Sequence, residues 1–153
     1  MTNHLERSHS IDLAGPVEHV FPLFTPVGAT LWVDGWNPEV LYPRNGETKE
    51  GMVFQTRHGE EVTLWACTDW RPQEHRVRYA RVTPGSRFGF VEVRCRDAGS
   101  RGTLASIAYT FTALGEQGQS YLSGLTEDAF TEMIETWKAS INAWLRKNAA
   151  NHE

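Results

Sequence analysis

The sequence lacks most of the features that assign a protein to a class at first sight. It holds two cysteines, Cys67 and Cys95, among 153 residues. Two are too few for a disulfide framework, so we expect a reducing, cytoplasmic setting. The longest apolar stretches, residues 20–24 and 62–67, are far too short to cross a bilayer. The first seven residues contain no apolar segment after a basic start, so no secretory signal is predicted.

The sequence also lacks the common signatures of cofactor and metal sites. None of the six histidines forms an H-x-x-x-H pair or stands beside a cysteine at ligand spacing, so no metal site is predicted. There is no Gly-x-Ser-x-Gly elbow, P-loop or dinucleotide fingerprint. Both cysteines are interpreted as small strand residues. We therefore expect no cofactor.

Positive charge is scarce overall but concentrated in one segment. The formal net charge is −4, which gives no support for a nucleic-acid partner. Residues 71–101 nevertheless hold eight arginines and three acidic residues. Because these arginines alternate along predicted strands, most of them are expected on a solvated outer face. We expect no nucleic-acid partner and no membrane insertion, and the oligomeric state, monomer or homodimer, stays open.

What the sequence does contain is one domain's worth of ordinary globular chain, 40% apolar and 22% charged. We predict a single domain over 1–153 with its core in 8–147. Alternation over 8–13 predicts a strand, and apolar residues at helical spacing predict a short helix over 17–24. A second short helix is predicted over 27–32, and the Gly- and Pro-containing segment 34–46 is predicted to be a loop.

From residue 51 onward the apolar pattern changes to a period of two. It predicts five strands, over 52–58, 61–70, 75–83, 88–96 and 103–114. The connections are short and rich in turn residues, which indicates an antiparallel meander, since parallel neighbours need long crossovers. The predicted order is therefore β-α-α-β5-α, an α+β fold with a six-stranded sheet.

The final element is a long amphipathic helix over 127–148. Thr126 is a suitable N-cap, and acidic residues precede basic ones along the helix, as the helix dipole favours. One stripe of this helix is apolar, and it consists of Phe130, Met133, Ile134, Trp137, Ile141, Trp144 and Leu145. The inner face of the curved sheet is the only large surface on which this stripe can be buried.

The alternation also predicts which strand residues face inward. On 61–70 two faces compete, and we favour the one that turns Trp65 inward. Between 75–83 and 88–96, a three-residue loop or a bulge places Arg78 opposite Glu92, a favourable pair. No Asp or Glu is predicted to face inward. The remaining inward rows are His9, Ile11 and Leu13; Met52, Phe54, Thr56 and His58; Val77 and Tyr79; Val91, Val93 and Cys95; and Ala105, Ile107, Tyr109 and Phe111.

These elements resemble the START/Bet v 1-like (helix-grip, SRPBCC) superfamily, in its polyketide cyclase/dehydrase-like branch. The resemblance covers about residues 8–147. It rests on the element order, the C-terminal helix and four motifs, namely Ile11-x-Leu13-x-x-Pro16-x-x-x-Val20-Phe21, Leu31-Trp32-Val33-Asp34-Gly35-Trp36-Asn37-Pro38, Gly51-Met52-Val53-Phe54 and Gly102-Thr103. It implies a curved sheet gripping the long helix around a cavity for hydrophobic or aromatic small molecules. Lipid carriers, hormone binders and aromatic-polyketide cyclases all share this scaffold.

Within such a cavity, several residues are candidates for ligand contact. Trp36 is expected at the mouth, whereas Trp32 is expected to belong to the core. His58 is either a polar group at the mouth or a strand-end histidine. Arg81 shares the parity of Tyr79, but it lies near a strand end, where its side chain is expected to turn outward. The candidate ligand-binding residues are Trp36, Phe54, His58, Trp65, Tyr79, Tyr109, Phe111, Phe130, Met133 and Trp137.

Three functions fit these expectations. The first is binding of a small hydrophobic or aromatic molecule by a carrier, sensor or sequestering protein. The second is a cyclase, dehydratase or related lyase on the same scaffold, which would confine a reactive chain beside one or two acid–base groups; His58, Tyr79 and Tyr109 are the available candidates. The third is a protein-interaction module that uses the arginine-rich outer sheet.

Overall fold

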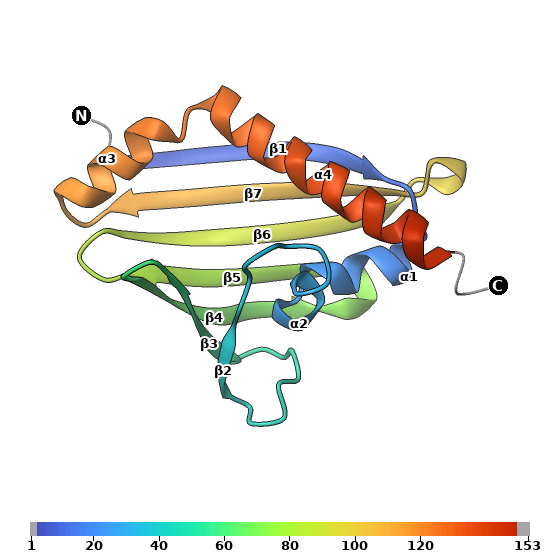
Figure 1. The fold of residues 1–153 in the computed structure, drawn as a ribbon, viewed down its shortest axis with the longest axis horizontal. Coiled ribbons are helices and arrows are strands. Elements are labelled where there is room, and N and C mark those ends of the chain that lie inside the picture. Colours follow the sequence, from blue (N-terminus) through green and yellow to red (C-terminus); the bar gives the residue numbers. More distant parts are fainter. Residues whose placement is uncertain (1–2, 150–153) are drawn as a thin grey trace.

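The computed structural model describes residues 3–149, and its core is one antiparallel sheet (Figure 1). The sheet has seven strands in the spatial order β1-β7-β6-β5-β4-β3-β2. Every neighbouring pair is antiparallel, as the short connections predict. The strands are β1 (His4–Leu13), β2 (Glu39–Tyr42), β3 (Val53–His58), β4 (Glu61–Arg71), β5 (Arg76–Thr83), β6 (Arg87–Asp97) and β7 (Thr103–Ala113).

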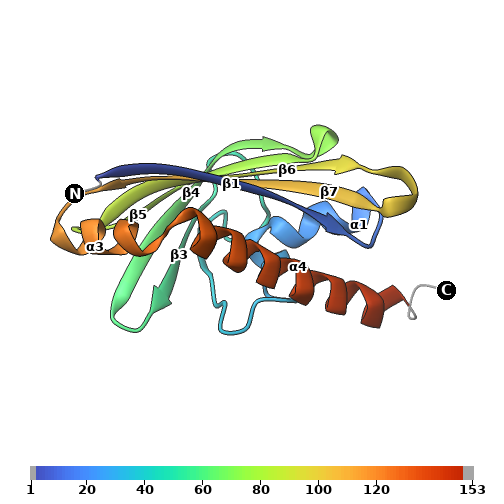
Figure 2. The same cartoon turned by 90° about the horizontal axis from the view of Figure 1, so that it is seen from above.

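Helices lie on one side of this sheet. The longest, α4 (Glu127–Ala149), runs obliquely across it, and Figure 2 shows the helix and the sheet as two layers. The short segments α1 (Val17–Val20), η1 (Phe21–Phe24) and α2 (Pro26–Ala29) lie near the C-terminal end of α4 (Figure 1). A further helix, α3 (Glu116–Gly124), precedes α4 at the opposite end of the sheet. None of the helices within residues 3–149 is long and apolar enough to span a membrane.

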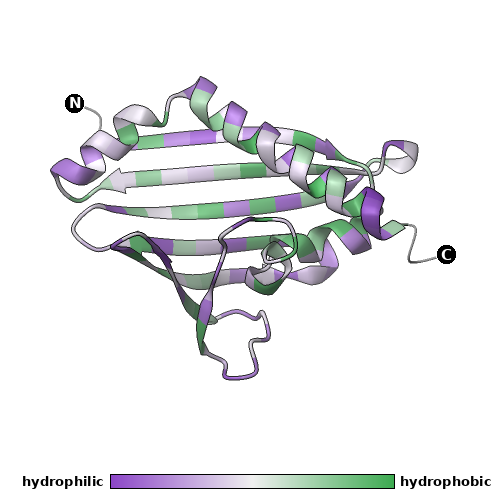
Figure 3. Ribbon diagram, viewed as in Figure 1, coloured by the Kyte–Doolittle hydropathy of each residue, from purple (hydrophilic) through white to green (hydrophobic). Residues whose placement is uncertain are grey.

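The predicted alternation of the strands is confirmed. In Figure 3 hydrophobic and hydrophilic bands alternate along the strands. Val77, Val93 and Ile107 are buried on the inner face, whereas their chain neighbours are more exposed. The inner row of β4 holds Trp65, which is 9% exposed, while Leu64 is 39% exposed. The apolar stripe of α4 packs on this inner face, where Phe130, Ile134, Ile141 and Leu145 are buried.

The β5–β6 hairpin has the register that the sequence favours. Thr83 pairs with Arg87 across a three-residue loop, and Arg78 stands opposite Glu92. A two-residue loop would have shifted the pairing and mixed the two faces. The expected start of α4 is also confirmed, because the Thr126 hydroxyl accepts a hydrogen bond from the backbone N–H of Ala129 at 3.1 Å.

Several elements differ from the sequence-based expectation. The sheet has seven strands rather than six, because β2 lies within the segment 34–46 that was predicted to be a loop. This strand is four residues long and follows a proline, so it gives almost no periodic signal. The second short helix covers Pro26–Ala29 rather than 27–32.

Helix α3 is the other element that the pattern missed. It contains two glycines, Gly118 and Gly124, which lower helix propensity and weaken the amphipathic signal. Gly118 is needed for packing: a Cβ there would overlap the carbonyl oxygen of Ser86 in the β5–β6 loop. Helix α3 therefore lies directly against that hairpin and covers this end of the sheet.

Candidate ligand-binding cavity

A cavity of about 500 Å³ lies between the inner face of the sheet, the segment from Phe24 to Ala29 and α4. This volume is within the range of small-molecule sites. Its lining includes five exposed residues that mark its rim: Asp34, Gly35 and Asn37 in the loop after α2, and Arg57 and His58 at the end of β3. Most of the large side chains along its walls are aromatic, namely Phe24, Trp32, Trp36, Phe54, Trp65, Tyr79, Tyr109, Tyr121 and Trp137.

Three of these rings form a compact aromatic corner on β3, β4 and the loop after α2. Phe54 and Trp65 are direct strand partners, and their rings stack at 5.3 Å between centroids, 11° from parallel. The Trp36 ring meets both of them edge-on, at 6.2 Å from Phe54 and 5.8 Å from Trp65. Such mutual packing fixes the rings, so the corner presents a rigid apolar wall.

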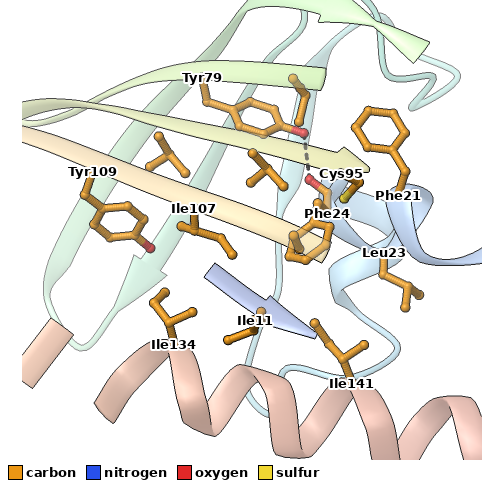
Figure 4. Packing of buried hydrophobic residues seen from close by; sticks show 14 of the residues in the cluster. Ile11, Phe21, Leu23, Phe24, Tyr79, Cys95, Ile107, Tyr109, Ile134 and Ile141 are labelled. Atoms are coloured by element: carbon orange, nitrogen blue, oxygen red, sulfur yellow. Dashed lines mark hydrogen bonds between the residues drawn. The ribbon is translucent and has the colours of Figure 1, made fainter. Parts of the chain in front are cut away.

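The polar atoms of these aromatic residues are bound within the protein. Trp36 donates its indole N–H to the carbonyl of Pro26 at 2.8 Å, and Trp65 donates to the Thr56 hydroxyl at 3.0 Å. The Tyr79 hydroxyl donates to the carbonyl of Phe24 at 2.9 Å, the dashed line in Figure 4. These three residues therefore offer ring surface, rather than a free hydrogen-bonding group, to the cavity.

The two inward tyrosines are neutral at physiological pH. Burial raises the pKa of Tyr109 to about 12, an effect that the neighbouring Arg81 opposes but does not overcome. Burial also raises the pKa of Tyr79 well above its ordinary value. Neither phenol is arranged to lose its proton near neutral pH, so neither is suited to act as a general base there.

Arg81 lines the cavity, which corrects the expectation that its side chain turns outward. It stands in the inner row of β5, between its strand partners Trp65 on β4 and Gly89 on β6. Its guanidinium carbon is 4.5 Å from the centroid of the Trp65 ring and 5.0 Å from that of Phe111. Because these rings hold the guanidinium on the inner face, strand-end position alone did not predict its direction.

Arg87 and Glu61 form an ion pair at the same end of the cavity. Both guanidinium NH2 groups of Arg87 donate to the Glu61 carboxylate, at 2.9 and 3.2 Å, and the Arg87 guanidinium carbon lies 3.6 Å above the Tyr121 ring. The Arg87 side chain is 6% exposed. Its Nε–H is buried without a hydrogen-bond partner. The Arg87 hydrogen bond lowers the pKa of Glu61.

This pair corrects two expectations. Glu61 is a carboxylate that lines the cavity, although no inward Asp or Glu was predicted. Arg87 is buried, although the central arginines were expected mostly outside. Both residues begin their strands, where a single residue gives no alternation to interpret. Helix α3 then covers them from the side of Tyr121, which the strand pattern could not reveal.

The ten candidate residues fall into two groups in space. Seven line the cavity: Trp36, Phe54, His58, Trp65, Tyr79, Tyr109 and Trp137. The other three are set behind the cavity wall: Phe111 and Phe130 are fully buried against Tyr109, and Met133 packs against the core. A contact between any of the ten and a ligand stays a prediction.

The cavity lining also contains residues that were not among those candidates, and they include Trp32, Glu61, Arg81, Arg87 and Tyr121. The parity of Arg81 with Tyr79 was the one available signal for its inward position. Trp32 packs against the core, as expected, and also lines the cavity; it donates its indole N–H to the Leu23 carbonyl at 2.8 Å.

Within the part of the chain that the structure describes, no three His, Cys, Asp or Glu residues lie close enough together to hold a metal ion. Cys67 and Cys95 are buried free thiols outside the cavity lining. Burial raises their pKa values, to about 11 for Cys67 and about 12 for Cys95. Both thiols are thus protonated at neutral pH, a state that disfavours nucleophilic chemistry.

On the outer face of the sheet, the arginines are largely occupied. Arg71 and Arg76 both contact the Asp69 carboxylate, at 2.9 and 3.2 Å. Arg94 contacts Glu92 at 3.1 Å, and the Arg78 guanidinium carbon lies 4.1 Å from the Phe90 ring centroid. Intramolecular pairing therefore reduces the positive charge available to an anionic partner on this face.

No protein-family model and no curated protein matches this sequence, but solved structures share its fold. The norcoclaurine synthase of Thalictrum flavum superposes with a TM-score of 0.66 and 8% identity, over 97% of this chain and 88% of the synthase chain. That synthase has also been solved in complex with dopamine and hydroxybenzaldehyde. A Staphylococcus aureus protein of unknown function gives a TM-score of 0.69 and 13% identity, over 96% of both chains.

The Zhui aromatase/cyclase of a Streptomyces species, strain R1128, superposes with a TM-score of 0.59 and 19% identity. The match covers 98% of this chain and 96% of the cyclase chain. Identities this low establish a common fold, but they do not establish a common activity. What the chain does must therefore be argued from its own cavity.

Proposed function

Because the chain has the helix-grip fold of the START/Bet v 1 superfamily, we propose that it binds a small hydrophobic, aromatic molecule in its internal cavity. The protein would act as a carrier, a sensor or a sequestering protein. The observation that carries this proposal is a cavity of about 500 Å³ with mainly aromatic large side chains along its walls. Apolar walls with few polar groups are the usual setting for such ligands.

The chemistry of the walls supports an aromatic ligand in particular. The rings of Phe54, Trp65 and Trp36 already pack by stacking and edge contacts, and a flat ligand ring can extend that arrangement. Since the indole N–H groups of both tryptophans are bound internally, entry of an apolar ring breaks no hydrogen bond. The dopamine and hydroxybenzaldehyde in the synthase complex are small aromatic molecules as well.

Binding without turnover is favoured over a cyclase or dehydratase activity. An acid–base enzyme needs an inward group that exchanges its proton near neutral pH. Tyr79 and Tyr109 have raised pKa values, and Glu61 has a lowered pKa and is occupied by Arg87. His58 is an exposed residue of the rim rather than an inward group.

A binding titration with a neutral probe tests the proposal. The probe is 2-naphthalenemethanol, and the measurement is isothermal titration calorimetry on the unmodified chain. V91F places a ring into the cavity from its β6 wall, and V82F places the same ring on the outer face of β5 as a matched control. We expect saturable 1:1 binding that V91F abolishes and V82F retains. Absence of binding to the unmodified chain, or equal binding to folded V91F, would contradict the proposal.

A further inference from the structure

We propose that the ligand of this cavity is an aromatic carboxylate whose carboxylate group pairs with the guanidinium of Arg81. This inference rests on the proposed function, because it names the chemical class of the molecule bound in the same cavity. It goes beyond that function by assigning one residue to one group of the ligand.

Arg81 is a cation on the cavity wall that lacks a countercharge. Across residues 3–149, no carboxylate lies within 4.0 Å of its guanidinium. The nearby Glu61 carboxylate is already held by two hydrogen bonds from Arg87. A half-buried charge that is surrounded by rings and has no anion beside it is costly, so an anion entering the cavity would be stabilised there.

The contacts of Arg81 are with aromatic residues, including an interaction with the Tyr109 hydroxyl, and none of them supplies an anion. Its guanidinium lies over the rings of Trp65, Phe111 and Tyr109, at 4.5, 5.0 and 5.8 Å from their centroids. A cation–π contact supplies no hydrogen-bond acceptor of carboxylate strength to the guanidinium N–H groups. Carboxylates bind its N–H groups at the edge, and they can do so with two parallel hydrogen bonds. The ring contacts therefore hold Arg81 on the inner face, and they leave its charge without a carboxylate partner.

Several other arginines differ from Arg81 in their partners or their burial. Arg57 also lines the cavity, but it lies at the rim and is exposed to solvent. Arg87 reaches the cavity but is neutralised by Glu61. Arg71, Arg76 and Arg94 each pair with a carboxylate on the outer face. Arg78, on the same strand as Arg81, stacks on Phe90 but faces away from the cavity. It therefore serves as a matched control.

The position of Arg81 also determines how the ligand would lie. Trp65 is its strand partner, and Trp65 stacks on Phe54, which meets Trp36. A carboxylate at Arg81 thus places an attached ring beside the aromatic corner. The carboxylate of a planar aromatic acid would pair with the Arg81 guanidinium, and the ring of the same molecule would pack against the aromatic walls.

The test compares two probes that differ in the charged group. The probes are 2-naphthoate and 2-naphthalenemethanol at neutral pH, titrated by calorimetry into the unmodified chain, R81Q and R78Q. We expect the unmodified chain and R78Q to bind naphthoate at least about tenfold more tightly than the alcohol, as a charge-assisted hydrogen bond implies. R81Q should lose this preference while its affinity for the alcohol stays within about twofold.

The outcomes separate the inference from the function on which it rests. Equal binding of both probes by the unmodified chain, or an unchanged preference in R81Q, would overturn the assignment of Arg81 and leave the cavity function standing. Loss of both probes in a folded R81Q would also overturn it, since the residue would then act by supporting the wall. Failure of both probes to bind the unmodified chain would contradict the proposed function itself. Where R81Q does not fold, R81K is the second variant. It keeps the positive charge but cannot form two parallel hydrogen bonds to a carboxylate, so its preference for naphthoate over the alcohol should fall.

Discussion

The guanidinium carbon of Arg81 lies 4.5 Å from the centroid of the Trp65 ring, and the two residues are direct partners across β4 and β5. The same inner row continues through Gly89 on β6 to Phe111 on β7. Gly89 leaves room for the Phe111 ring, on which Arg81 also rests. The strand register thus places the Arg81 guanidinium within an aromatic wall, and its partner on β6 has no side chain.

The missing side chain at Gly89 is therefore expected to be a structural requirement. A Cβ there would lie 2.4 Å from a carbon of the Phe111 ring and 2.5 Å from the Thr110 carbonyl oxygen. G89A should lower the free energy of unfolding by about 2 kcal/mol or more in urea titrations, because a packed wall must shift. G124A is the control, since a Cβ at Gly124 meets nothing within 4 Å; equal stability of the two variants would contradict this view.

The Arg87–Glu61 pair should contribute to stability at neutral pH. E61Q leaves the buried guanidinium of Arg87 without its anion, which is costly. Because the Glu61 side chain is 38% exposed, we expect a moderate loss, about 1–2 kcal/mol of unfolding free energy. E60Q changes the same residue type at the exposed neighbouring position and should cost less than about 0.5 kcal/mol. Chemical denaturation measures both.

The same pair predicts a dependence on pH. Arg87 lowers the pKa of Glu61 in the folded protein from its ordinary value of 4.5. The stabilisation is thus fully present above pH 4.5 and is lost as the pH falls through the lowered pKa. The stability difference between the unmodified chain and E61Q should be constant near neutrality and shrink in acid. A difference that grows in acid would show that the pair does not act in this way.

The N-cap of α4 offers a test that is independent of the cavity. The Thr126 hydroxyl accepts a hydrogen bond from the N–H of Ala129, so T126A should destabilise the protein by about 1 kcal/mol. Thr136 lies in the middle of the same helix, where its hydroxyl bonds only to the Glu132 carbonyl. T136A should change stability by less than about 0.5 kcal/mol. Thermal unfolding monitored by circular dichroism would compare them.

The two thiols should be inert in the folded protein. Cys67 and Cys95 are buried, and their pKa values of about 11 and 12 leave almost no thiolate at pH 8. Ellman's reagent should therefore release one equivalent per thiol in denaturant and very little under native conditions. Rapid reaction of either thiol in the native state would contradict the burial described for it.

Much of this fold could be predicted from the sequence where a pattern repeats. Five consecutive alternating segments determined the meander, and the Arg78–Glu92 pair identified the hairpin register. The long apolar stripe of α4 required a surface, and the sheet was the only one available. Each of these features depends on many residues that agree. The inward face of β4 was less clear, because both of its alternating rows contain apolar residues, and the structure turns the favoured Trp65 inward.

Prediction failed where one residue or a short element decides the outcome. Strand β2 has four residues and α3 contains two glycines, so neither gives a clear period. Arg81 has the parity of an inward residue, but the direction of a long charged side chain depends on what surrounds it. The rings of Trp65 and Phe111, brought together by register, hold it on the inner face.

The six tryptophans allow the central claim to be measured directly. Trp32, Trp36, Trp65 and Trp137 line the cavity, whereas Trp70 and Trp144 do not. The measurement is the indole N–H region of a ¹H–¹⁵N correlation spectrum during titration with 2-naphthalenemethanol. Binding in the cavity predicts saturable shifts of the four lining indoles and small changes at the other two. Unchanged spectra, or shifts confined to Trp70 and Trp144, would contradict an aromatic-binding cavity.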